Sequence, residues 1–185
     1  TYSRGMITGW GAHMYDIAQW GLGVDRDGGP VKVSATAKFP DRGLFDVHMQ
    51  YEAEAEYASG VKLISHSGAA GVKFTGDRGW LWVARGNWKA EPEDILRTKL
   101  DDNDVRLYES KNHMRNFLAC CRTGKDPVAP AEVGHRSNTV CVLHHIAMKH
   151  QGKTLTWDPK TERFTGNSTD ANAMLDYPHR KPWMV

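Results

Sequence analysis

The most chemically loaded stretch of the sequence runs from Met6 to Asp16. It places Gly9 and Gly11 directly before a predicted helix, where the backbone can approach a ligand closely and leave amide donors free. His13 falls in the opening turn of that helix, where the positive end of the helix dipole favours neutral imidazole. A neutral histidine can carry a proton near physiological pH, and Asp16, one turn later, is placed to orient its ring. This spacing indicates a general acid/base site, while the same residues also suit a solvated helix end without chemistry.

Three further residues are candidates for binding. Trp10 offers an aromatic face that suits a sugar ring. His135 and Arg136 stand near the start of a long predicted helix, where an anion or a sugar hydroxyl can bind, and a solvated helix end explains them equally well. Nine histidines raise the question of a metal, but no HExxH motif occurs. The adjacent His144 and His145 would point about 100° apart on a helix, so we expect no metal site.

These residues need elements that hold them in place, and the alternation of apolar and polar residues predicts a sheet. Residues 31–39 alternate, and residues 45–57 do so over a longer run that puts His48 and three glutamates on its polar side. One polar face favours antiparallel pairing, because parallel sheets are covered on both faces. Lys32 and Lys38 are placed to pair with the glutamates across strands. Further strands of this meander are expected over 61–65, 71–75 and 80–84, and a last hairpin at 155–157 and 163–164.

Helical spacing predicts the remaining elements. A short helix is expected within residues 8–23, and its end is marked by Gly21 and Gly23. A second helix has Ser110 as its N-cap and stops at Gly124. Its core-facing stripe is Met114, Phe117, Leu118 and Cys121. A third helix over 131–150 turns inward Val140, Leu143, Ile146 and Ala147, and a short one follows at 171–175. The expected architecture is α+β, an open and mainly antiparallel sheet with helices on one face, in a single domain over residues 1–185.

Composition narrows the class of protein. The chain has 185 residues, 24 Lys and Arg against 22 Asp and Glu, and 40% hydrophobic residues, which is globular composition at the length of one domain. The charges are scattered, so we expect no nucleic-acid partner, and no apolar run approaches the ~18 residues that span a bilayer. Three cysteines without a CxxC pair indicate free buried thiols and favour a cytoplasmic location. The opening at Thr1 suggests the middle of a longer protein.

Several motifs, taken in order, resemble the Gfo/Idh/MocA family, the relatives of glucose–fructose oxidoreductase, inositol dehydrogenase and the rhizopine-catabolism proteins. The first is Gly9-x-Gly11-x-His13-x-x-Asp16 followed by Ala18-x-Trp20-x-Leu22-Gly23, which is similar to the start of that family's C-terminal domain. The others resemble one bacterial subgroup: His113-x-x-Asn116-Phe117-Leu118, Pro130-Ala131-Glu132-x-x-His135-Arg136-Ser137, Ile146-Ala147-Met148 and Leu155-Thr156-Trp157-Asp158-Pro159. The resemblance covers essentially the whole chain.

The resemblance implies a parent enzyme with two domains, an NAD- or NADP-dependent oxidoreductase that acts on a sugar, a polyol or a glycoside. Its Rossmann domain would carry a GxGxxG loop and a catalytic Lys in Glu-Lys-Pro, and neither motif occurs here. We therefore expect this chain to be the C-terminal domain, inactive alone and joined to that missing N-terminal domain. The resemblance implies that its sheet forms a homo-oligomer and that His13 is the catalytic histidine, oriented by Asp16. Trp10, His135 and Arg136 would line the substrate pocket.

Two other functions remain open. The chain fits a stand-alone binding or oligomerisation module that kept the fold and lost catalysis, because the polar strand face and the aromatic content suit an interface. A hydrolase or lyase that needs no cofactor could also be built on His13 and Asp16. The family's usual Asp, four residues before the histidine, is Gly9 in this sequence, which leaves the acid/base partner open.

Overall fold

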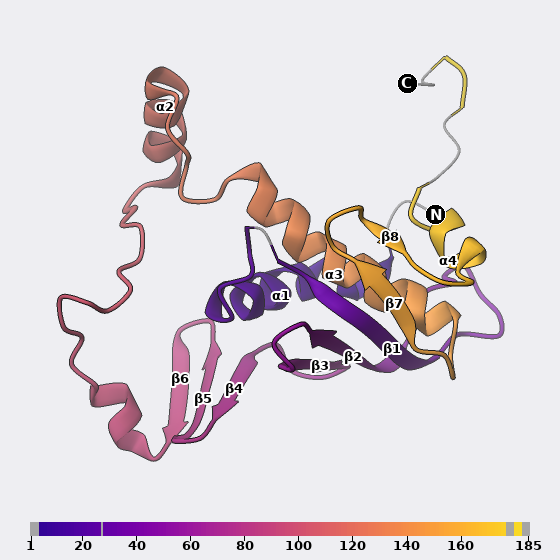
Figure 1. Ribbon diagram of the computed structural model, residues 1–185, viewed down its shortest axis with the longest axis horizontal. Coiled ribbons are helices and arrows are strands. Elements are labelled where there is room, and N and C mark those ends of the chain that lie inside the picture. Colours follow the sequence, from indigo (N-terminus) through magenta and orange to yellow (C-terminus); the bar gives the residue numbers. More distant parts are fainter. Residues whose placement is uncertain (1–3, 27, 177–179, 183–185) are drawn as a thin grey trace. The chain divides into compact units, whose positions relative to one another are not determined.

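The computed structural model describes residues 4–26, 28–176 and 180–182, and Figure 1 shows its helices and strands. Internal contacts divide the chain into two compact units. Unit 1 comprises residues 1–69 and 136–185, and unit 2 comprises residues 70–135. The single domain expected over residues 1–185 stays a prediction.

Unit 1 is built on an antiparallel five-stranded sheet in the order β3-β2-β1-β7-β8. The strands are β1 (Pro30–Lys38), β2 (Gln50–Tyr57), β3 (Lys62–His66), β7 (Leu155–Asp158) and β8 (Arg163–Phe164). Val33 lies opposite Ala55, and Ala35 lies opposite Ala53, so the four buried side chains share one face of the sheet. On the other face, Lys32 forms the expected cross-strand ion pair with Glu56.

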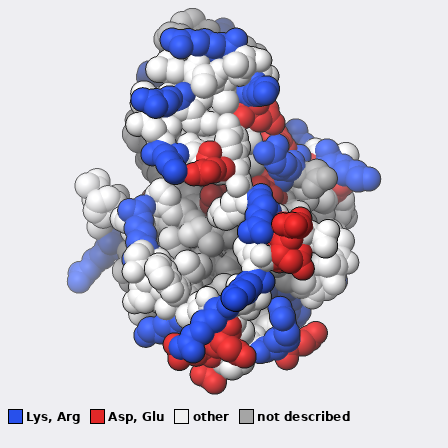
Figure 2. Space-filling model, turned by 90° about the vertical axis from the view of Figure 1, so that its left-hand side faces the viewer, with Lys and Arg blue, Asp and Glu red and all other residues white. Residues whose placement is uncertain are grey.

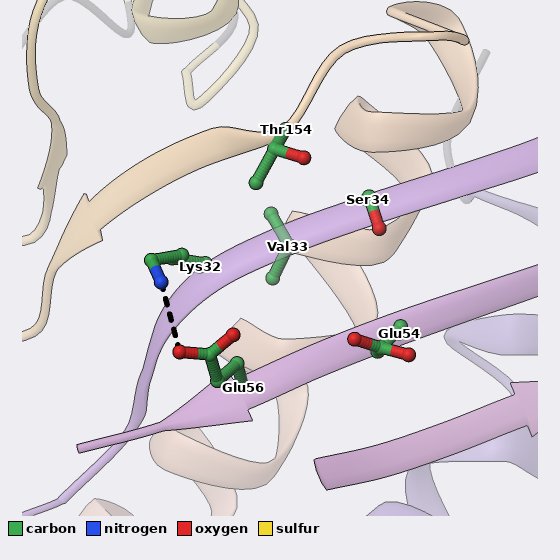
Figure 3. A pocket seen from close by; sticks show the side chains of 6 residues that line it. All are labelled: Lys32, Val33, Ser34, Glu54, Glu56 and Thr154. Atoms are coloured by element: carbon green, nitrogen blue, oxygen red, sulfur yellow. Dashed lines mark hydrogen bonds and ion pairs between the residues drawn. The ribbon is translucent and has the colours of Figure 1, made fainter. Parts of the chain in front are cut away.

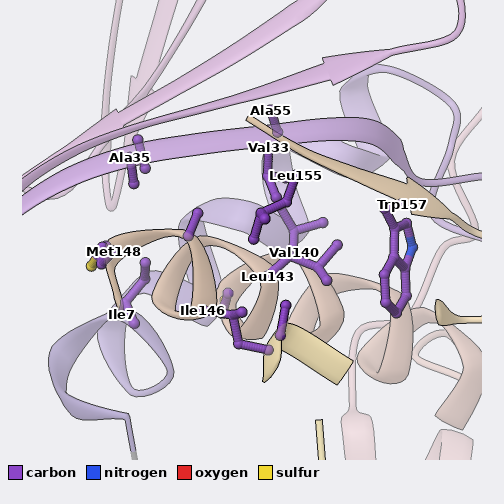
Figure 4. Packing of buried hydrophobic residues seen from close by; sticks show 14 of the residues in the cluster. Ile7, Val33, Ala35, Ala55, Val140, Leu143, Ile146, Met148, Leu155 and Trp157 are labelled. Atoms are coloured by element: carbon purple, nitrogen blue, oxygen red, sulfur yellow. The ribbon is translucent and has the colours of Figure 1, made fainter. Parts of the chain in front are cut away.

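Two helices cover the apolar face of this sheet. They are α1 (Trp10–Gly21), which follows a 3₁₀ helix over Gly5–Ile7, and the unit 1 part of α3 (Ala131–Lys149). Figure 4 shows Val140 and Leu143 of α3 beside Val33 and Leu155 of the sheet. The four α3 residues predicted to face inward have no exposed surface. A short helix, α4 (Thr169–Ala173), follows the sheet. The α+β prediction, an open antiparallel sheet with helices on one face, is thereby confirmed.

Unit 2 holds a second antiparallel sheet, β4-β5-β6, with the strands β4 (Val72–Gly76), β5 (Gly79–Ala84) and β6 (Asn87–Glu91). A 3₁₀ helix over Glu93–Arg97 and the helix α2 (His113–Thr123) follow. The sequence predicted β4 and β5 as part of one meander and missed β6. Most of β6 is exposed, and its alternation covers only five residues with two apolar side chains, Trp88 and Ala90, which is too short to distinguish a strand from a loop.

The strand predicted over residues 45–57 is shorter than expected, because it begins at Gln50. Residues 41–49 contain bends, and Phe45 and Met49 are exposed instead of buried. His48, predicted on the polar side, is buried with edge-on contacts to the rings of Phe39 and Tyr51. The prediction was wrong here because a bend breaks the period of two, so parity along the sequence no longer assigns a face.

The helix α2 has the predicted stop but a different start and a different environment. Its N-cap is Asn112, whose side-chain oxygen accepts a hydrogen bond from the Arg115 amide at 2.8 Å, so the Ser110 cap was wrong. Gly124 ends it in the left-handed conformation, as predicted. The stripe expected to face a core is exposed: Met114 65%, Phe117 51% and Leu118 51%, with Cys121 exposed beside them. The period identified the apolar face correctly, but it carried no information about what covers that face.

Candidate functional site

The start of α1 is open at its two glycines. Gly9 is the N-cap of α1. Apart from chain neighbours and the nearby backbone of the same helix, the atoms nearest to a Cβ at Gly9 would be 3.8 Å away, and those nearest to a Cβ at Gly11 would be 3.5 Å away. Both separations are ordinary contact distances, so packing does not require glycine at either position. Gly5 differs, because its φ of +81° strains any other residue. The missing side chains at positions 9 and 11 therefore leave the first turn of α1 accessible to a ligand.

His13 lies on the outward face of α1 between two exposed tryptophans. Its ring is 5.5 Å from that of Trp10, centroid to centroid, in an edge-on arrangement. Trp10 is 47% exposed, and Trp20, seven residues after His13 and so on the same helical face, is 50% exposed. Indole faces suit the apolar faces of sugar rings, and an exposed imidazole between them can exchange protons with a hydroxyl. Trp20 was not among the site residues predicted from the sequence, although its spacing of seven residues from His13 is the signal that could have found it.

Asp16 points toward α3 and not toward His13. Its Oδ1 accepts a hydrogen bond from the Ser137 hydroxyl at 2.8 Å. Within the described part of the chain, no hydrogen bond joins Asp16 to His13. The expected orienting contact is thus not present, and the carboxylate instead ties α1 to α3. Ser137 is a residue that the sequence could not reveal as its partner.

Arg136 is held by the turn between β7 and β8. Its Nη1 donates to the Pro159 carbonyl at 3.0 Å and lies 3.4 Å from a carboxylate oxygen of Glu162, and its side chain is only 18% exposed. This arrangement gives Arg136 a structural role within unit 1. His135, the residue before it on α3, belongs to unit 2 and is exposed.

Three other histidines of unit 1 are buried. Burial lowers the pKa of His144 to about 4, and its Nδ1 lies 2.5 Å from the Tyr15 hydroxyl oxygen. Burial, together with the nearby Arg4 cation, lowers the pKa of His145 to about 4. Burial and the Lys149 cation lower the pKa of His48. The described side chains include no group of three His, Cys, Asp or Glu that could hold a metal ion.

The outer face of the five-stranded sheet carries a shallow hollow lined by charged side chains (Figure 3). Lys32 pairs with Glu56 across it at 2.9 Å, and Lys62 pairs with Glu54 at 2.8 Å nearby. Its volume of about 90 Å³ is well below the ~300 Å³ at which small-molecule pockets begin. Basic side chains also lie beside acidic ones over the lower half of Figure 2. This hollow is a feature of a charged surface, and the α1 site remains the better candidate.

The whole chain, residues 1–185, matches a family model described as the oxidoreductase family, C-terminal alpha/beta domain, of the Gfo/Idh/MocA type. No curated protein matches the sequence. Among solved structures, an NAD-binding protein from Listeria innocua is 14% identical over 82% of this chain and 47% of its own, with a TM-score of 0.54. An aldose-aldose oxidoreductase from Caulobacter crescentus is 16% identical, with a TM-score of 0.46, and the match covers 79% of this chain and 45% of that protein.

At such identities the Listeria structure supports the fold alone, and the chain spans about half the length of the solved structures it matches.

A nicotinamide dinucleotide does not fit the described residues. The sequence has no GxGxxG, and Gly9, the N-cap of α1, follows a 3₁₀ helix. Every strand pair described is antiparallel, whereas dinucleotide sites follow a strand of a parallel sheet. None of the described helices is both long and apolar enough to cross a membrane.

Proposed function

Because the chain belongs to the Gfo/Idh/MocA oxidoreductase family as its C-terminal alpha/beta domain, we propose that it supplies the substrate site of an NAD- or NADP-dependent oxidoreductase. The substrate is a sugar, a polyol or a glycoside. The observation that carries this proposal is the position of His13, which is exposed beside an open glycine turn and between Trp10 and Trp20. Stacking on the indoles would orient the sugar ring, and His13 would meet one of its hydroxyls.

In this proposal His13 is the general acid/base of the reaction. When the carbinol is oxidised, its imidazole takes the proton of the substrate hydroxyl, and the hydride of the same carbon would pass to the dinucleotide. In the reverse direction the imidazole returns the proton. The dinucleotide would bind to an N-terminal Rossmann domain of the parent protein, so the chain's own contribution is proton transfer and substrate binding. Alone, the chain would be inactive.

The other candidate residues take different roles. Asp16 would act through its bond to Ser137, which fixes α1, and not through direct contact with the imidazole. His135 would bind substrate through its exposed ring. Arg136 would do so through its guanidinium, which also contacts Pro159 and Glu162.

The test is His13→Ala in the intact parent enzyme. We expect kcat/KM to fall at least about 100-fold, or about 2.7 kcal/mol of transition-state stabilisation, the lower end for a lost general base. His113→Ala is the matched control, because His113 is also an exposed histidine in the first turn of a helix. A His13→Ala enzyme within a factor of two of the parent would remove the catalytic assignment.

A second role, oligomerisation through the five-stranded sheet, is favoured by the paired charges on its outer face. Lys32 and Glu56, and Lys62 and Glu54, give this face both signs in alternation, which suits a second copy of the same face. Analytical ultracentrifugation of the chain tests it, and a strict monomer at high concentration would contradict it. The same face would serve a stand-alone module without catalysis, which the His13→Ala result distinguishes.

We also propose a cytoplasmic location for the parent protein. The three free cysteines of the described chain support it, because unpaired thiols persist in a reducing compartment. Cell fractionation is the test.

A further inference from the structure

The inward face of α1 is polar where a short helix usually presents aliphatic side chains. Three of its residues, at positions 15, 16 and 19, form hydrogen bonds to α3. Tyr15 pairs with His144 at 2.5 Å, Asp16 with Ser137 at 2.8 Å, and Gln19 with the backbone oxygen of Arg136 at 3.3 Å. Tyr15 and Gln19 are four residues apart and lie on one face. The exposed His13 and Trp20 lie on the outward face.

The contact at Gln19 also reaches the sheet. Its side chain has no exposed surface, and its Oε1 accepts a hydrogen bond from the Tyr57 hydroxyl at 2.7 Å. One amide therefore joins α1, α3 and β2. A buried amide must keep its partners, because an unpaired polar group away from water is costly. This makes the position of α1 relative to α3 and β2 specific.

We propose that these three contacts, which we call the α1 clamp (Tyr15–His144, Asp16–Ser137 and Gln19 with its two partners), are a positioning device for the proposed catalytic His13. Apolar burial is non-directional and tolerates small shifts, whereas hydrogen bonds fix both rotation and register. One residue of slippage would turn α1 by about 100° and carry His13 away from its place. The inference rests on the proposed function of His13, but the clamp itself can be tested without it.

The clamp has members that can be removed with little change in shape. Ser137→Ala deletes the donor to Asp16, and Tyr15→Phe deletes the hydroxyl while the ring still fills its space. Asp16→Asn is the conservative variant, because its side chain keeps an oxygen that accepts from Ser137. Val140→Ala is the matched structural control, since it opens a cavity in α3 without removing a hydrogen bond of the clamp.

The experiment measures position and activity separately in the intact parent. The position of α1 is read from the NMR resonances of the His13 ring and the Trp10 indole N–H, and stability from the thermal midpoint. We expect the double variant Tyr15→Phe/Ser137→Ala to shift or broaden both resonances. We expect kcat to fall at least 10-fold with KM changed less than 3-fold, because a displacement of about 1 Å can cost about 100-fold. Asp16→Asn should keep kcat within 3-fold.

The control separates positioning from stability. Val140→Ala should lower the thermal midpoint while the His13 and Trp10 resonances and kcat stay unchanged. Unchanged resonances in the double variant would overturn the clamp, and so would an equal loss of kcat in Val140→Ala. If the double variant moves the resonances but His13→Ala leaves kcat unchanged, the proposed function fails while the clamp remains as a structural device. If the double variant does not fold, Ser137→Ala alone gives the same readouts.

Discussion

Mild acid should destabilise unit 1 through its buried histidines, and His144 gives the clearest case. The side chain has no exposed surface, and burial lowers its pKa from the ordinary 6.5 to about 4. The unfolded chain therefore binds a proton at this position between pH 6.5 and pH 4, and the folded chain does not. Stability is complete above pH 6.5 and falls as the pH falls through this window.

The magnitude follows from the two pKa values. At pH 5 the unfolded histidine is almost fully protonated and the folded one is almost neutral, so His144 alone costs about 2 kcal/mol relative to pH 7.5. The loss approaches about 3 kcal/mol near pH 4. His145 and His48 shift in the same direction and add to it. The pKa values of the Glu56 and Asp158 carboxyls are lowered in the folded chain, so these groups reduce the unfolding free energy only at lower pH, where carboxyls become protonated. Above pH 5 the change in unfolding free energy therefore comes from the histidines.

The assay is urea denaturation followed by far-UV circular dichroism at pH 7.5, 6.5, 5.5 and 5.0. His144→Gln removes the titration, so its drop in unfolding free energy between pH 7.5 and 5.0 should be about 2 kcal/mol smaller than that of the parent chain. His66→Gln, at an exposed histidine of unit 1, should leave the drop unchanged. Identical pH dependence in His144→Gln and the parent chain would refute the reasoning.

Three further outcomes follow from the same structure. Leu143→Ala should lower the unfolding free energy by about 2–5 kcal/mol in urea, because a side chain with no exposed surface leaves a cavity. Gly9→Ala should keep the thermal midpoint, since the added Cβ lies no closer than 3.8 Å to atoms outside its own helix turn and chain neighbours. It should lower kcat/KM of the parent enzyme, because the methyl group would obstruct a ligand at this turn, and an unchanged kcat/KM would contradict this. A thiol reagent should modify exposed Cys121 in the native protein and spare Cys141, whose pKa burial raises to about 12, until urea unfolds the chain.

The sequence predicted the elements whose period survives folding. Alternation over β1 and the later part of β2 correctly predicted strands, and Val33 and Ala55 are buried opposite each other, because a strand keeps its period of two as long as it is straight. The prediction failed at His48, because bends before β2 interrupt the alternation of the two strand faces. It also failed at α2, where the apolar stripe was correctly located but its surroundings depend on contacts that no local pattern encodes.

In the candidate site, contacts within one helix could be predicted from the sequence, and contacts between distant residues could not. The Trp10–His13 contact joins residues three apart on one helix, so spacing alone could predict it. The Asp16–Ser137 bond joins residues 121 apart, and the sequence offered a nearer partner of suitable chemistry in His13. Local spacing therefore wrongly predicted a contact between Asp16 and His13. Only the packing of α1 on α3 could reveal that the carboxylate serves the helix interface.

Histidines on α1 and α3 differ in their access to water, and this affects how the proposed catalysis must be measured. His13 is exposed and can exchange protons with solvent or substrate, whereas His144 is buried and resists protonation. The buried histidines begin to lower the stability of unit 1 as the pH falls below 6.5. A fall in the activity of the parent enzyme below this pH must therefore be compared with the loss of stability before it is assigned to His13. His144→Gln makes this comparison, because it removes part of the loss of stability and leaves His13 in place.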